Sequence, residues 1–254
     1  MKMIGMLKTK YGPAMLLCLI LLFIWQAAAA AVGRTHILPG PIQILVRTWE
    51  LRDSLLLHHL PATLLTIVSG WLFSVGIGIT LAVIMNADRY AAALLHTPLI
   101  MTQTIPVMCI SPLFVVWFGY TLPARLTAVV LSTFFAITLN TYDGLRSADP
   151  KKKELLQTFG AGRLQIFLQL EVPSAFPRLM TALKMTAPWV VIDAAVAEWL
   201  GATEGLGYFS KRMISKMDGA AVFAPLLILC IIAFTGMALL RFIEKKTAGY
   251  RNEL

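Results

Sequence analysis

The sequence predicts an all-α, polytopic membrane protein, and three observations lead to this fold class. Of its 254 residues, 58% are hydrophobic and 14% are charged, whereas globular domains carry about 25% charged residues. Six apolar stretches approach the ~20 residues that a helix needs to cross a bilayer with its backbone polar groups bonded internally. The lysines and arginines gather on one side of these stretches. A water-soluble enzyme is excluded, because a soluble fold of this size cannot bury so much apolar surface.

The six predicted membrane spans follow one another along the chain. To within a few residues at each end, they cover residues 13–32, 61–85, 94–118, 126–142, 181–200 and 222–240. The first span follows Lys2, Lys8 and Lys10 and ends in an alanine run, a pattern that also occurs in secretory signal peptides. Its apolar part is longer than the core of a usual signal peptide, and five further spans follow it. We therefore expect it to remain in the protein as a membrane span.

The distribution of basic residues predicts the orientation. With the N-terminus in the cytoplasm, six spans return the C-terminus there, and fifteen of the 22 lysines and arginines then lie on the cytoplasmic side. Cytoplasmic loops of membrane proteins carry such an excess. Anchoring to the anionic lipid of the bilayer explains the net charge of +9 and the isoelectric point near 9.7. No groove of aromatic and basic residues indicates a nucleic-acid partner.

The second span carries one face of small residues. Gly70, Ser74 and Gly78 recur every four residues, and Ala82 continues the series. Such a face allows a neighbouring helix to approach closely. Packing within the chain is favoured over a dimer contact.

The third span is interrupted by prolines. Pro98, Pro106 and Pro112 break the helix near Gln103 and Thr104. A broken backbone at membrane depth is tolerated where protein or a water-filled cavity receives the freed polar groups. Gln103, Thr104 and Pro106 are therefore candidates for lining a translocation pathway; the alternative is a kink that serves packing only.

Three further polar residues lie in or beside the later spans. Asp193 and Glu198 are five residues apart, about 500° of helical turn, so their side chains diverge by about 140° and cannot form one site. Asp193 lies deeper and should pair with a partner, because an unpaired carboxylate is costly there. Glu198 is expected near the outer interface, where capping or gating competes with solute contact. Asn140 is a neutral alternative for the pathway.

No pattern indicates catalysis, a metal or a cofactor. Cys18, Cys109 and Cys230 each lie in an apolar run without metal or redox spacing, so we expect small buried side chains. The histidines fit no zinc pattern, and the adjacent His58 and His59 precede a span, which favours a pair at the membrane interface. There is no Gly-x-x-x-x-Gly-Lys-Ser/Thr loop that could hold ATP.

The loop of residues 143–178 is the longest polar segment. Asp149 and Pro150 are typical of an N-cap and a first helical position. Gly160 fits the left-handed residue that ends a short helix. A second short helix is expected near residues 163–171 with one apolar side, ended by Val172 and Pro173. From spacing alone, a docking element for a cytoplasmic partner and an amphipathic hairpin lying on lipid are equally favoured.

This loop resembles the EAA loop of the permease subunits of ABC importers. The family pattern is Glu-Ala-Ala, three residues, Gly, nine residues, Ile-x-Leu-Pro, and the register here matches without a gap. Leucines replace the two alanines, and the turn is similar to the family's Gly-Ala-Ser-Arg. The residues that carry the resemblance are Glu154, Leu155, Leu156, Gly160, Ala161, Gly162, Arg163, Leu170, Val172 and Pro173.

Other segments are similar to the branch of this family that imports sulfonates, taurine, nitrate and pyrimidine vitamin precursors. They are residues 38–41, 105–106, 140–144, 197–202 and 205–208. The resemblance implies the type I permease fold in the inner membrane of a bacterium. It also implies a second permease copy, two cytoplasmic ATPase subunits and an external solute-binding protein as partners. Residues 154–163 would form the coupling helix, with Gly160 as its pivot and Arg163 as a charged contact, in a subunit that is not itself an enzyme.

The resemblance also ranks the solutes. A small, polar or anionic organic nutrient is expected, first a thiamine-related hydroxymethylpyrimidine-type precursor, because Ala-Glu-Trp-Leu-Gly-Ala at residues 197–202 is most similar to that branch. A sulfonate such as taurine comes second and nitrate third. The alternative class is a secondary transporter driven by an ion gradient. It predicts broken helices at matching positions of two inverted repeats, and the sequence has one proline-broken span without a counterpart.

Overall fold

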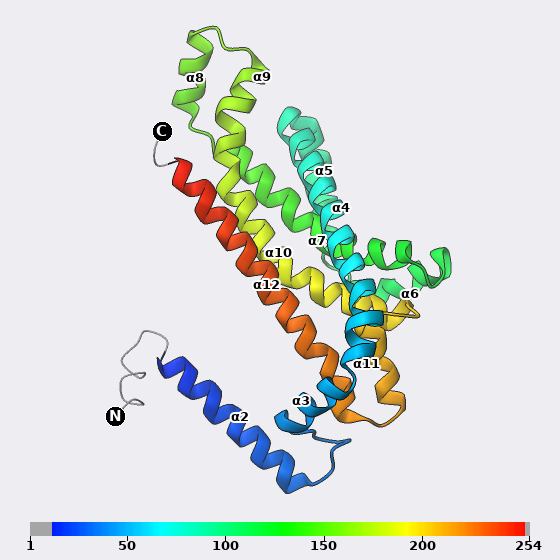
Figure 1. The fold of residues 1–254 in the computed structure, drawn as a ribbon. Coiled ribbons are helices and arrows are strands. Elements are labelled where there is room, and N and C mark those ends of the chain that lie inside the picture. Colours follow the sequence, from blue (N-terminus) through cyan, green and yellow to red (C-terminus); the bar gives the residue numbers. More distant parts are fainter. Residues whose placement is uncertain (1–11, 252–254) are drawn as a thin grey trace.

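The computed structural model describes residues 12–251, and this part of the chain is built from helices and short turns (Figure 1). Lys2, Lys8 and Lys10, which contribute to the predicted orientation, lie outside the described residues. The elements, in chain order, are α2 (Gly12–Val32), α3 (Pro41–Glu50), the π-helical η1 (Ser54–His59), α4 (Leu60–Ala87), α5 (Arg89–Thr102), α6 (Val107–Phe118), α7 (Leu122–Arg146), α8 (Pro150–Thr158), α9 (Arg163–Ile166), the π-helical η2 (Phe167–Glu171), α10 (Val172–Gly201), α11 (Leu206–Ser215) and α12 (Gly219–Arg251).

The predicted number of spans agrees with these helices. Five helical segments of the described chain are long and apolar enough to cross a membrane, and the pair α5 and α6 adds a sixth span if the two are taken together. The two helices meet at 97° across residues 103–106, so the expected break in the third span is present. The spans are longer than the apolar stretches alone, because polar residues extend the helices at their ends; α12, for example, continues to Arg251.

One predicted boundary is wrong. Val172 and Pro173 were expected to end the second loop helix, but α9, η2 and α10 follow one another as a single helical segment from Arg163 to Gly201. Pro173 lies in the first turn of α10, directly after the π-helical turn. Proline has no N–H to donate, so the segment lacks one backbone bond at residue 173, and the π-helical turn, whose bonds span one residue more than those of an α-helix, lies directly before it. The loop is therefore continuous with the fifth span.

The core is formed by α4, α7 and α10. A Cβ added at Gly70 would lie 2.7 Å from the side chain of Val129, and one at Gly78 would lie 2.8 Å from that of Ile137. Between them, Ser74 Oγ is 2.6 Å from Thr133 Oγ1. The small-residue face of the second span thus packs against α7 of the same chain, as predicted. Further along α7, Gly144 packs directly on the backbone of Ala175 in α10.

The first span stands apart from this core. Only 6% of the apolar part of α2 is buried, and in Figure 1 most of the helix stands away from the bundle. Near its C-terminal end, α2 is followed by α3, and the ring centroid of Trp25 lies 6.2 Å from that of Phe223 in α12. The expectation of buried cysteines is also wrong, since Cys18, Cys109 and Cys230 are all exposed on the chain. In a membrane protein an apolar side chain can face lipid or another subunit instead of the chain's own core.

Candidate functional site

The loop between α7 and α10 forms a helical hairpin that projects from one end of the bundle (Figure 1). The Asp149 carboxylate accepts a hydrogen bond from the backbone N–H of Lys151 at 2.9 Å, and Pro150 is the first residue of α8, as predicted. Gly160 follows the helix with φ of +80°, in the left-handed region. No heavy atom lies within 4 Å of a Cβ built on it. Glycine is therefore required there by backbone conformation rather than by space.

The hairpin exposes apolar side chains. Leu155 of α8, Phe159 directly after this helix and Leu164 of α9 are all exposed, Phe159 to 79%. Ala161 and Gly162 form the turn between α8 and α9, and Glu154 and Leu156 lie on α8. Apolar side chains at the tip of a polar hairpin are typical of an interaction surface.

A buried carboxylate ties this hairpin to the bundle. Glu171 of η2 is only 8% exposed. Its Oε1 accepts a hydrogen bond from Lys153 Nζ of α8 at 2.6 Å, and its Oε2 accepts one from Asn86 Nδ2 of α4 at 2.7 Å. The Arg163 guanidinium donates to the main-chain carbonyl of Ala87. The Glu171 side chain thus joins α4 and α8 to η2, which continues directly into α10.

Sequence reasoning did not single out Glu171, although it lies inside the matched loop pattern. The only available signal was a carboxylate on an otherwise apolar stretch with lysines one helix away. Its contact with Asn86 is 85 residues distant in sequence and could not be anticipated.

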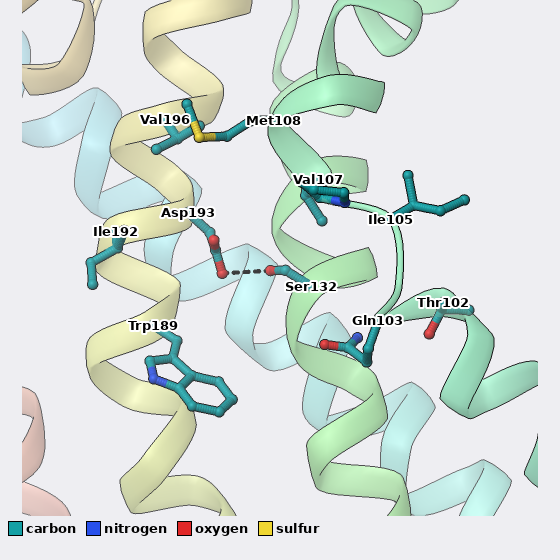
Figure 2. Close-up of a pocket in the computed structure, with 11 residues that line it drawn as sticks. Thr102, Gln103, Ile105, Val107, Met108, Ser132, Trp189, Ile192, Asp193 and Val196 are labelled. Carbon is teal, nitrogen blue, oxygen red and sulfur yellow. Dashed lines mark hydrogen bonds between the residues drawn. The ribbon is translucent and has the colours of Figure 1, made fainter.

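A second candidate region is a cavity at the break between α5 and α6. Its volume is about 290 Å³, and it lies between the break, α7 and α10 (Figure 2). Gln103 and Pro106 line the cavity, whereas Thr104 is exposed and lies outside the lining. Ser132 of α7 and Trp189 of α10 also line the cavity, and neither was predicted.

Asp193 provides the carboxylate of this cavity. Ser132 Oγ donates a hydrogen bond to Asp193 Oδ2 at 2.5 Å, so Asp193 has the partner that its depth required. Figure 2 shows the two side chains pointing toward each other from α10 and α7, with Gln103 at the break and Trp189 one helical turn away from Asp193. Carboxylate, hydroxyl, amide and indole groups therefore surround one hollow in the transmembrane region.

The other two pathway candidates lie elsewhere. Asn140 Nδ2 donates to the carbonyl of Ala136 in its own helix, at 2.8 Å. Glu198 is fully buried. Its Oε2 accepts hydrogen bonds from Thr63 Oγ1 at 3.0 Å and from the backbone N–H of Gly207 at 2.9 Å. Glu198 therefore caps the N-terminus of α11, one of the roles considered for it, and does not share a site with Asp193.

His58 and His59 lie at the end of η1, close to the junction of α10 and α11 that Glu198 caps. Gly205, with φ of +113°, connects α10 to α11 and donates its N–H to His59 Nδ1 at 3.2 Å. His59 is buried, with its ring centroid 5.1 Å from that of Phe209, whereas His58 is exposed. The expected interfacial pair is thus divided, because one histidine packs into the helical junction. Among the described residues, no group of three or more histidine, cysteine or acidic side chains could hold a metal ion.

Comparison with known proteins agrees with this architecture. A family model described as the binding-protein-dependent transport system inner membrane component matches residues 74–249. The formylaminopyrimidine transport permease protein ThiX of Halalkalibacterium halodurans is 44% identical over 92% of this chain and 94% of that protein. The putative aliphatic sulfonates transport permease protein SsuC of Bacillus subtilis is 26% identical over 96% and 90% of the two chains.

A solved structure shows the same fold. The matching chain belongs to a bacterial alginate ABC transporter in complex with its alginate pentasaccharide-bound periplasmic protein. The TM-score is 0.63 at 16% sequence identity, and the match covers 91% of this chain and 93% of that one.

Proposed function

The chain belongs to the family of binding-protein-dependent transport system inner membrane components, and we propose that its solute is a substituted aminopyrimidine. The protein is the multi-pass, non-catalytic permease subunit of an ABC importer, and it has the fold of type I permeases. It acts with ATPase subunits and a solute-binding protein. The observation that supports the solute is the 44% identity to a formylaminopyrimidine permease over nearly the whole of both chains, against 26% for the sulfonate permease.

The hairpin at α8 is the proposed point of energy input. Residues Glu154 to Arg163 would sit in a cleft of the ATPase, with the exposed Leu155 and Phe159 as the apolar contacts. Closure of the ATPases on ATP would then move α8 as a rigid body. Because η2 runs directly into α10, and Glu171 bonds to Asn86 of α4, movement of the hairpin would be passed to two core helices at once.

A homodimer with both termini in the cytoplasm completes the proposed assembly. The basic residues support this orientation, since the α8 end then carries most of them. The apolar surface of α2, left uncovered by the rest of the chain, is available for lipid or for a second copy. Ile105, Met108 and Ile192 beside the cavity are also exposed, so two copies could enclose a pathway between their cavities.

Replacing Gly160 by valine should uncouple ATP hydrolysis from uptake. A β-branched residue at φ of +80° is strained by roughly 1–2 kcal/mol, so the turn between α8 and α9 would change shape. Gly33→Val is the matched control, because Gly33 also has a positive φ, of +64°, and open space around its Cβ, but follows α2 and lies outside the hairpin. Uptake and ATPase activity are measured together in proteoliposomes. Equal behaviour of the two variants would contradict a pivot at Gly160.

Transport itself tests the solute. The permease is reconstituted with its ATPase and binding protein, and uptake of labelled hydroxymethylpyrimidine and formylaminopyrimidine is compared with uptake of taurine. We expect ATP-dependent accumulation of the pyrimidines only. Accumulation of taurine instead would overturn the solute assignment, and pyrimidine uptake driven by an ion gradient without ATP would indicate a secondary transporter.

A further inference from the structure

The cavity at the broken span combines one carboxylate with neutral polar groups and an aromatic ring. Asp193, Ser132 and Gln103 supply the polar atoms, and Trp189 supplies the indole (Figure 2). Among the described residues that line it, none is lysine, arginine or histidine. The charge of this hollow is therefore zero or negative and cannot be positive.

We propose that this cavity is a solute-selecting site of the permease, and that it takes a flat heteroaromatic ring bearing N–H donors and rejects organic anions. The inference rests on the proposed function, and it adds that selection takes place within the membrane as well as in the binding protein.

The geometry supports hydrogen bonding to an aminopyrimidine. Asp193 Oδ2 is occupied by Ser132, which fixes the carboxyl group and leaves its second oxygen without a hydrogen bond among the described residues. A carboxylate accepts from an exocyclic amino group, and a protonated carboxyl also donates to an adjacent ring nitrogen. The ionised form of Asp193 can therefore accept from the amino group of an aminopyrimidine, and the protonated form can donate to its ring nitrogen. The amide of Gln103, which both donates and accepts, lies at the break on the other side of the hollow.

Size and apolar lining support a ring as the ligand. A volume of about 290 Å³ lies near the lower limit of small-molecule pockets. Trp189 offers an aromatic ring for stacking, since Trp189 and Asp193 are four residues apart and share one face of α10. Pro106, Val107 and Val196 complete an apolar wall. A sulfonate would bring a negative charge to Asp193 without any basic partner, an arrangement that disfavours binding.

Binding to the permease–ATPase complex without its binding protein tests the site directly. Equilibrium dialysis with labelled 4-amino-5-hydroxymethyl-2-methylpyrimidine should show binding that the unlabelled pyrimidine displaces and ethanesulfonate, an anion without an amino group, does not. Asp193→Asn, which removes the charge-assisted bond, should weaken binding about 10- to 100-fold. Asp53→Asn is the matched control, because the Asp53 side chain is 78% exposed and lies outside the cavity.

A second measurement does not depend on how the Asp193 variant folds. Met108 lines the cavity, and Met108→Cys in a chain without the three native cysteines can be labelled with a small water-soluble thiol reagent. The pyrimidine should slow labelling several-fold and ethanesulfonate should leave the rate unchanged. Protection by ethanesulfonate, or the absence of both binding and protection while the intact transporter still imports the pyrimidine, would overturn the site and leave the proposed function standing. Failure of the intact transporter to import the pyrimidine would instead contradict the proposed function.

Discussion

Replacement of Glu171 by alanine is expected to lower ATP-driven uptake about 2- to 30-fold, the range of about 0.5–2 kcal/mol through which single residues alter coupling between distant sites. The variant removes the bonds to Lys153 at 2.6 Å and to Asn86 at 2.7 Å. The hairpin would then move without carrying α4 along. Because Glu171 is buried in the permease, the ATPase activity of the complex should persist, and the number of solute molecules imported per ATP is the quantity to measure.

Two lysines of α8 provide the control for this prediction. Lys153→Ala removes one of the bonds to Glu171 and should show the same defect to a smaller degree. Lys152→Ala removes a neighbouring exposed lysine for which no ion pair occurs within the described part of the chain, and it should couple normally. If the two lysine variants behave alike, coupling depends on the total positive charge of α8, and the bond between Lys153 and Glu171 does not transmit movement.

Replacement of Gly207 by alanine is expected to destabilise the junction of α10 and α11. The new methyl group would overlap the main-chain carbonyl of Ala195 and lie 2.8 Å from its carbon. Backbone cannot rotate away as a side chain can, so α11 must separate from α10 and lose the bond to Glu198. Overpacking of this kind costs about 1–3 kcal/mol, or a fall in Tm of about 2–12 °C for a chain of this size.

Gly236→Ala is the matched control for steric overlap. A Cβ at Gly236, in α12, meets no heavy atom within 4 Å, so this variant should melt close to the unmodified protein. Thermal unfolding in detergent, followed by the loss of monodisperse protein in size-exclusion chromatography, compares the two. A Gly207→Ala variant as stable as Gly236→Ala would show that α10 and α11 are not packed as closely as described.

The features that could be predicted from sequence are those set by local chemistry. Hydrophobic length gave the spans, and Pro106 gave the broken third span, because each depends on consecutive residues. Pro98 and Pro112 were also expected to interrupt the helix, but they lie inside α5 and α6. The Asp149 cap and the left-handed Gly160 are equally local. The spacing of Gly70, Ser74 and Gly78 predicted close packing, although not that α7 is the helix they contact.

The features that could not be predicted depend on contacts between distant segments. Ser132 and Asp193 are 61 residues apart, and Thr63 and Glu198 are 135 apart, so the roles of these two carboxylates follow only from the packing of α4, α7 and α10. The helix continues through Pro173 because a π-helical turn precedes it, and the sequence pattern carries no clear signal for such a turn. Exposure of the cysteines has the same origin, since apolarity in a membrane protein does not distinguish lipid from core.

Photo-crosslinking from α8 tests most directly whether the hairpin receives movement from an ATPase. A photo-reactive benzoyl-phenylalanine is placed at Leu155, which is exposed on α8, and at Trp49 of α3, exposed at the opposite end of the bundle, as the control. The complete transporter is irradiated with and without ATP. We predict an adduct between position 155 and the ATPase subunit whose yield changes with ATP, and none from position 49. Adducts of position 155 with lipid alone, with the ATPase present and active, would contradict the coupling role of the hairpin.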